Sequence, residues 1–193
     1  MTQPEALEGR IADALAAGDL AAAATEGIRG YGRELLRYLG SLLGDEDAAG
    51  DAFAETCAKI WRGLADFRSD SSFRTWAYRI AWNTARDHAR DARRRHQRVR
   101  RLDTAEAEEL AEKISRSLGR TSPDVRLARI AARLDLEERS LLLLRVERRL
   151  SWKDIARVLS DAGDPVDDVA VRKRFDWLKK KIRKLADERL ASG

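Results

Sequence analysis

The 193-residue chain contains few of the residues on which disulfide-stabilised, metal-binding or β-sheet proteins depend. Cys57 is the only cysteine, which excludes an intrachain disulfide and a cysteine-rich metal site. Only three prolines occur, and no long run of β-branched residues alternates with polar ones. Ala, Leu, Arg and Glu dominate instead. Because these four residues favour helices, we expect an all-α fold.

Long apolar runs are also absent. No stretch of about 18 apolar residues occurs that could cross a membrane. The polar segment from Met1 to Arg10 lacks the apolar centre of a signal peptide. We therefore expect a cytoplasmic protein with no membrane partner.

The sequence patterns of enzyme sites are missing as well. There is no glycine-rich phosphate loop, no metal-ligand spacing and no pattern of a nucleophile triad. His88 and His96 lie in an arginine-rich stretch, and Cys57 lies on a predicted apolar face, so we expect each to be structural or solvated. We expect no catalytic residue, no metal and no cofactor, and do not expect an enzyme.

Charge is abundant, and the positive charge is concentrated in two places. Charged residues make up 37% of the chain, with a net charge of +5. Segment 86–101 carries eight arginines against two aspartates, and segment 172–184 carries eight Lys or Arg against one aspartate. Because these two segments together exceed the net charge of the chain, the remainder is net acidic. The pattern predicts two phosphate-binding surfaces, with solvated helix faces as the alternative.

Apolar periodicity predicts two groups of helices. The first group has three: 28–43, 47–64 and 73–95. The second group has four: 123–134, 137–148, 151–159 and 168–190. We therefore expect two small helical domains joined by a linker. The predicted parts are an N-terminal lead-in with a short, peripheral helix (1–20), a first domain (21–97), a linker (98–122) and a second domain (123–193).

The last two predicted helices form a helix-turn-helix pattern. Ser151 followed by Asp154 is a variant of the capping box, which marks a helix start. Such a unit places its second helix in the DNA major groove, with its early residues on the bases and later ones on phosphates. The candidate DNA contacts on this helix are Arg172, Lys173, Arg174, Asp176, Trp177, Lys179, Lys180 and Arg183.

Segment 67–83 interleaves aromatic residues, arginines and small polar residues. Aromatic rings can stack on unpaired bases, while Arg and Asn can hold phosphates and base edges. This composition predicts capture of a strand separated from a duplex. Trp76 is more simply explained as a core residue, whereas Tyr78, Trp82 and Asn83 lie on more polar sides of the helix.

An acidic segment precedes this region and contains no basic residue: Asp45, Glu46, Asp47, Asp51 and Glu55. Acidic residues at the start of a helix complement the helix dipole. That effect fades after the first turn, so it explains Asp51 and Glu55 poorly. The alternative is that these acidic residues form a surface that binds another protein.

Both halves resemble the extracytoplasmic-function (ECF) sigma factors, the small branch of the bacterial sigma family. In the first half the matching runs are Asp51-Ala52-Phe53-Ala54-Glu55-Thr56 and Ser72-Phe73-Arg74-Thr75-Trp76-Ala77-Tyr78-Arg79-Ile80-Ala81. In the second half they are Leu150-Ser151-Trp152-Lys153-Asp154-Ile155-Ala156 and Val171-Arg172-Lys173-Arg174-Phe175. The resemblance covers residues 25–95 and 130–185.

The resemblance implies a sigma factor that directs promoter-specific transcription initiation by core RNA polymerase. The first domain, conventionally domain two, would bind the polymerase clamp through Asp51, Ala52, Glu55, Thr56 and Lys59. It would also recognise and open the minus-ten promoter element through Arg68, Ser71, Ser72, Arg74, Tyr78, Arg79, Trp82, Asn83, Arg86, Arg90, Arg93 and Arg94. Domain four would grip the minus-thirty-five element with the helix from Val171. Members of the family are commonly held inactive by an anti-sigma factor.

The sequence departs from the family pattern at three places. Ala54 stands where Gln is usual, and Leu134-Asp135 replaces Leu-Pro. The turn from Ser160 to Ala170 is longer than usual and acidic, so we expect it to point away from DNA or to meet another protein.

Three other interpretations compete with the sigma factor. A helix-turn-helix regulator that acts without polymerase leaves the aromatic residues of 73–83 unexplained. A polymerase adaptor without DNA contact leaves the two basic helices unexplained. An enzyme lacks the motifs named above.

Overall fold

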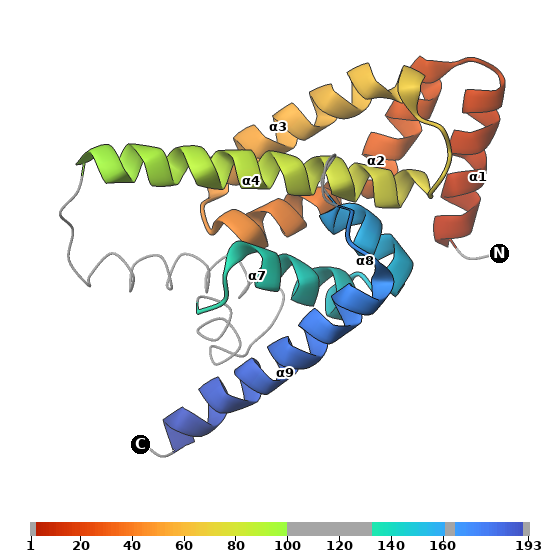
Figure 1. Ribbon diagram of the computed structural model, residues 1–193. Helices are drawn as coiled ribbons and strands as arrows, with labels where there is room; N and C mark the ends of the chain where they lie inside the picture. The colour runs from red at the N-terminus through yellow and green to blue at the C-terminus, as the bar shows by residue number, and fades with distance from the viewer. Residues whose placement is uncertain (1–2, 100–132, 161–164, 191–193) are drawn as a thin grey trace.

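A computed structural model describes residues 3–99, 133–160 and 165–190 (Figure 1). Within these ranges every regular element is a helix and no strand occurs, which confirms the predicted all-α fold. The predicted linker (98–122) and the predicted helix 123–134 lie, apart from their ends, outside the described residues. So does the middle of the acidic turn, 161–164.

Four helices form the N-terminal bundle: α1 (Gln3–Ala16), α2 (Leu20–Leu43), α3 (Glu46–Gly63) and α4 (Phe73–Val99). The apolar residues of α2 recur at spacings of three and four and bury one face, including Leu35, Leu39 and Leu42. Each such side chain stabilises the fold by about 1.5–3 kcal/mol. Helix α2 ends at Gly44, whose φ of 69° is left-handed and favours glycine, as the predicted stop requires.

Helix α1 belongs to this bundle and is not the peripheral lead-in that we expected. Its Ile11 is 1% exposed, and Leu7 packs against α2 where Gly30 leaves room. A Cβ at Gly30 would lie 2.1 Å from Leu7 Cδ2, so the glycine permits the close approach. The short apolar pattern of α1 is a weak signal by itself, and its burial depends on a partner helix that the local pattern does not reveal.

The second bundle begins with α7 (Leu136–Leu142), which continues into the π-helical segment η2 (Leu143–Glu147). Helix α7 starts with a capping box, in which Asp135 and Glu138 each accept a hydrogen bond from the other's backbone N–H. The predicted cap at Ser151 is confirmed, because its Oγ accepts from Asp154 N at 3.1 Å. It opens α8 (Trp152–Leu159).

Helix α9 (Asp168–Leu190) completes the helix-turn-helix. Val171 and Leu178 are fully buried against the bundle, and Phe175 and Ile182 are partly buried, as predicted for its core face. Phe175 packs its ring against Trp152 of α8, with centroids 5.3 Å apart. The predicted helix pair is therefore present.

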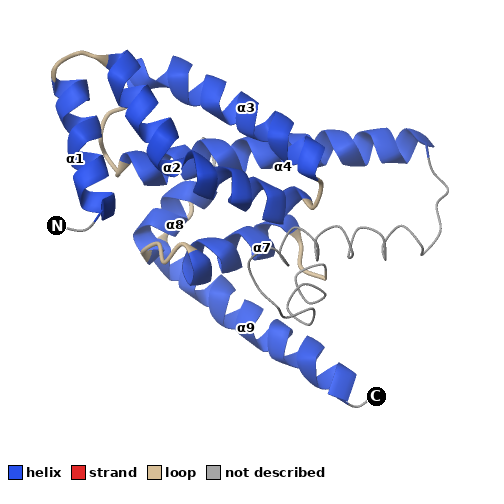
Figure 2. Ribbon diagram, turned by 180° about the vertical axis from the view of Figure 1, so that it is seen from behind, coloured by secondary structure: helices blue, strands red, loops and turns tan. Residues whose placement is uncertain are grey.

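The two bundles lie against each other. Figures 1 and 2 show α8 beside α4 from opposite sides, and α7 also contacts α2, while α9 extends away toward the C-terminus. A short 3₁₀ turn, η1 (Leu64–Asp66), and a loop connect α3 to the N-terminal end of α4. None of the described helices is long and apolar enough to cross a membrane.

Candidate nucleic-acid interface

Helix α9 presents its basic residues to solvent. All eight predicted contacts on this helix are exposed: Arg172, Lys173, Arg174, Asp176, Trp177, Lys179, Lys180 and Arg183. The ring of Trp177 is more than half exposed and lies 5.3 Å from Lys181 Nζ. Lys179 lies 2.7 Å from Asp176 and lowers the pKa of that carboxyl. Helix α9 therefore presents a positively charged surface with one exposed tryptophan ring.

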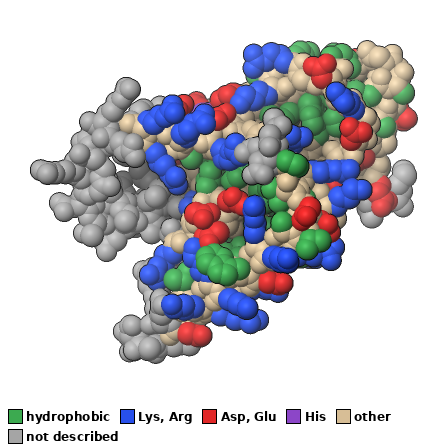
Figure 3. All heavy atoms as spheres, in the orientation of Figure 1, with side chains coloured by type: hydrophobic (Ala, Val, Ile, Leu, Met, Phe, Trp, Pro, Cys, Tyr) green, Lys and Arg blue, Asp and Glu red, His purple; other side chains and the backbone are tan. Residues whose placement is uncertain are grey.

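Figure 3 shows Lys and Arg side chains gathered along α9 and on the distal part of α4, with acidic side chains between them. Glu137 and Glu138 of α7 contribute acidic side chains beside α9. Arg174 of α9 contacts Glu137, and Lys181 of α9 contacts Glu138 at 2.6 Å. The two basic segments predicted from the sequence thus lie on separate helices, and acidic side chains lie between them.

A hollow of about 320 Å³ lies where the loop 67–72 meets the start of α4. The rings of Phe67 and Trp76 lie 4.9 Å apart on its wall, and the predicted contacts Arg68, Ser71 and Arg79 also line it. Trp76 therefore serves both the core, as we expected, and the hollow. Arg157 of α8 reaches the same hollow, a contribution that no local pattern indicated.

Two predicted contacts at the start of α4 already have partners within the protein. Ser72 caps the helix, accepting from Thr75 N at 3.1 Å. Arg74 donates two hydrogen bonds to the Glu34 carboxylate at 2.6 and 3.1 Å, and its guanidinium lies over the Tyr78 ring. In this arrangement Ser72 supports the first turn of α4, and Arg74 joins α4 to α2.

The middle of α4 is covered by α2 of its own bundle and by α8 of the second bundle. Tyr78 and Trp82 are 0% and 3% exposed, although we expected them on a polar side. The reason is tertiary: the Tyr78 ring packs edge-on against Tyr38 of α2, with centroids 5.1 Å apart, and Trp82 faces Leu159 of α8. The Tyr78 hydroxyl, Trp82 Nε1 and Asn83 Oδ1 are buried without a hydrogen-bond partner.

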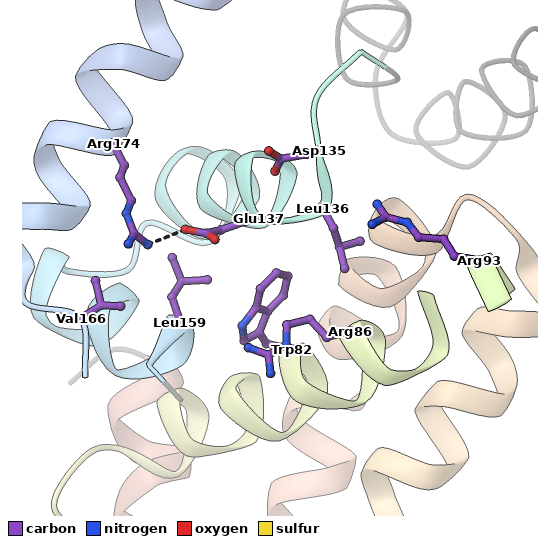
Figure 4. Close-up of a pocket in the computed structure, with 9 residues that line it drawn as sticks. All are labelled: Trp82, Arg86, Arg93, Asp135, Leu136, Glu137, Leu159, Val166 and Arg174. Carbon is purple, nitrogen blue, oxygen red and sulfur yellow. Dashed lines mark hydrogen bonds and ion pairs between the residues drawn. The ribbon is translucent and has the colours of Figure 1, made fainter. Parts of the chain in front are cut away.

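Farther along α4, the predicted contacts Arg90, Arg93 and Arg94 are exposed. Figure 4 shows Trp82 and Arg86 of α4 facing Leu159 and Glu137 of the second bundle across a cleft of about 380 Å³. Arg86 lies 5.8 Å from the centroid of the Trp82 ring. Residues predicted to contact two different promoter elements, Trp82 and Arg174, therefore line one cleft.

The predicted polymerase surface on α3 is smaller than expected. Ala52 and Thr56 are 0% exposed, and Thr56 Oγ1 donates to the Ala52 carbonyl at 2.7 Å, because both lie on the core face of α3. Asp51 is exposed, and Glu55 and Lys59 are partly exposed. These three residues form the accessible surface, which we call the α3 surface.

The α3 surface is tied to α4. Glu55 contacts Lys59 at 2.8 Å and His88 of α4 at 2.9 Å, and these two side chains lower the pKa of its carboxyl. His88 thus has a structural contact, as expected. Burial raises the pKa of the Cys57 thiol, which disfavours a reactive thiolate. Among the described residues, no group of His, Cys, Asp or Glu has the arrangement of a metal site.

The family model for sigma-70 region 2 matches residues 28–95 of this chain, which span the α3 surface, the hollow and most of α4. RNA polymerase sigma factor NccH of Alcaligenes xylosoxydans xylosoxydans is 31% identical over 182 residues, covering 90% of this chain and 94% of the relative. RNA polymerase sigma factor YlaC of Bacillus subtilis (strain 168) is 28% identical over 163 residues, covering 84% and 94%. Other matching relatives are named ECF RNA polymerase sigma factors.

A solved structure also resembles the whole arrangement. CnrH in complex with the cytosolic domain of CnrY matches with a TM-score of 0.62 and 26% identity, covering 94% of this chain and 97% of that chain. The helical bundles, the two basic helices and these relatives all indicate the same family. The chain belongs to the ECF sigma factors, the RNA polymerase subunits that direct promoter-specific transcription initiation.

Proposed function

We propose that three surfaces of this sigma factor divide its work. The hollow and the adjoining face of α4 recognise and open the minus-ten element. Helix α9 binds the minus-thirty-five element, and the α3 surface docks on core RNA polymerase. The cytoplasm, where polymerase works, is the proposed location.

The hollow is the observation that carries the minus-ten assignment. An unpaired base needs a flat apolar wall and nearby cations for its phosphates, and stacking contributes about 1–3 kcal/mol per base. Phe67 and Trp76 supply the wall. The lining carries three cations, Arg68, Arg79 and Arg157, against the two carboxylates of Asp66 and Asp70, so its charge is net positive. The volume of about 320 Å³ leaves room for one base.

Transcription in vitro tests the function as a whole. Core polymerase with this protein is expected to start transcripts from genomic DNA that core alone does not start, and their 5′ ends define a promoter for later tests. Tight core binding without any specific transcript would favour the adaptor. Specific duplex binding without polymerase would favour the helix-turn-helix regulator.

The α3 surface has its own test. Charge reversal in Asp51→Arg with Glu55→Arg is expected to abolish core binding with the helical circular dichroism retained, since Asp51 is exposed and Glu55 is partly exposed. The matched control is Asp13→Arg with Asp187→Arg, which changes the net charge equally at exposed positions away from α3. Normal core binding by the first double variant would remove this surface from the proposal.

We also propose an anti-sigma partner. CnrH is solved together with the cytosolic domain of CnrY, and the present chain matches CnrH over nearly its full length. Co-purification from the native host with a second protein that suppresses the specific transcripts would support this partner.

A further inference from the structure

Glu8 of α1 contacts the first turn of α4 from a distant part of the chain. Its Oε2 accepts a hydrogen bond from Phe73 N at 2.8 Å, and its Oε1 accepts from Arg74 N at 3.0 Å. Oε1 also accepts from the Tyr31 hydroxyl at 2.7 Å, which joins α2 to the same carboxylate. One side chain thus connects α1, α2 and α4.

This contact caps the first turn of α4 together with Ser72. The first four N–H groups of a helix have no acceptor within the helix. Ser72 serves one of them, because its Oγ accepts from Thr75 N at 3.1 Å, and its carbonyl accepts the first helical hydrogen bond from Trp76 N. Glu8 serves two more, those of Phe73 and Arg74, and its negative charge suits the positive end of the helix dipole.

The capped turn borders the hollow. Phe73 packs directly over Gly27 of α2, where an added Cβ would lie 2.2 Å from Phe73 Cζ, and its ring stacks with Tyr31 at 6.2 Å. Phe73 also contacts Phe67 and Trp76, the two rings of the hollow wall. A shift of this turn would therefore move the wall.

We propose that Glu8 is a positioning residue for promoter opening: it fixes the start of α4 and so the shape of the hollow. This proposal rests on the proposed function of the hollow. Glu8 acts through Phe73 and Arg74 and touches no DNA itself.

Single-round transcription on two templates tests the role of Glu8. One template is a fully paired promoter, and the other carries the same promoter with a mismatched, already open minus-ten bubble. Glu8→Ala is expected to lower initiation on the paired template by about tenfold, because the variant loses the charge-assisted hydrogen bonds that Glu8 accepts from Phe73 N and Arg74 N. On the open template it is expected to regain wild-type initiation.

The matched control is Glu26→Gln. It removes the exposed Arg10–Glu26 ion pair between α1 and α2 but leaves the α4 cap intact, so both templates should behave as with the wild type. Should Glu8→Ala unfold the bundle, Glu8→Gln provides the same comparison, because it keeps the size of the side chain and removes one acceptor oxygen.

Two results would overturn the role of Glu8. One is paired-template activity equal to that of Glu26→Gln, and the other is a defect that the open template does not rescue, which would assign Glu8 to folding or polymerase binding. The hollow itself is tested separately with Arg68→Ala and Arg79→Ala. If those variants initiate normally on both templates, the proposed function of the hollow fails, whatever Glu8 does.

Discussion

At the residue scale, the three tyrosines show how strongly the protein covers its polar groups. Tyr31, Tyr38 and Tyr78 are the only tyrosines of the chain, and all three are buried. Burial is the main cause that raises the pKa of each phenol, and the Glu8 carboxylate adds to the rise for Tyr31. The neutral phenol is therefore favoured in the folded state.

Alkaline titration should show this directly. A tyrosine in an unfolded chain ionises near pH 10, so above that pH the unfolded state binds fewer protons than the folded state. The stability from the raised pKa is fully present below about pH 10 and is lost as the pH rises further. We expect no tyrosinate absorbance near pH 10 in the folded protein, and a cooperative rise only with alkaline unfolding. A gradual rise near pH 10 before unfolding would contradict the burial of at least one ring.

At the element scale, the approach of α2 to α4 depends on a glycine. A Cβ at Gly27 would lie 2.2 Å from Phe73 Cζ, whereas a Cβ at Gly50 in α3 would meet nothing within 4 Å. Gly27→Ala is expected to destabilise the protein by about 1–3 kcal/mol through overpacking. Gly50→Ala is expected to stabilise it by up to about 1 kcal/mol, because Ala favours helices. Urea unfolding of the two variants measures both signs, and equal effects would refute the close packing at Gly27.

Helix α9 should bind DNA largely through its charge. Arg172 is paired with Asp168 and Arg174 with Glu137, and both arginines remain about half exposed, so they are free to exchange these carboxylates for phosphates. For holoenzyme on a minus-thirty-five duplex, Arg172→Ala with Arg174→Ala is expected to weaken binding and lower the salt slope by about one per lost phosphate contact. Lys153→Ala, exposed on α8, is the control. An unchanged salt slope in the double variant would place the DNA contacts elsewhere.

At the scale of the whole molecule, we expect the contact between the bundles to compete with polymerase binding. Arg139 donates to the Leu42 carbonyl across this contact at 2.6 Å and holds the bundles closed, whereas Arg145 bonds to the Leu150 carbonyl within its own bundle at 2.9 Å. A protein that is mostly closed binds its partner with an apparent affinity reduced by the open fraction. Arg139→Ala is therefore expected to bind core polymerase faster than the wild type, and Arg145→Ala is expected to match the wild type. Stopped-flow association measures the rates. Equal rates for Arg139→Ala and the wild type would mean that closure does not limit assembly.

Much of this molecule follows from local sequence. The spacing of Leu35, Leu39 and Leu42, the stop at Gly44 and the cap at Ser151 depend on neighbours within a turn or two, and the structure confirms them. The exposure of the α9 basic residues follows for the same reason, because the helix period separates them from Val171 and Leu178. Family membership also followed from runs of adjacent residues.

Only the tertiary structure decided which polar residues are accessible and what supports the candidate site. Nothing near Glu8 indicates that it caps α4, and nothing near Ser140 indicates that it meets Tyr38. Ala52 and Thr56 belong to the same predicted polymerase-binding motif as Asp51, but the packing of α3 buries these two side chains. The physical reason is that helix periodicity is set within a few residues, whereas burial and pairing depend on which distant surface arrives to cover each face.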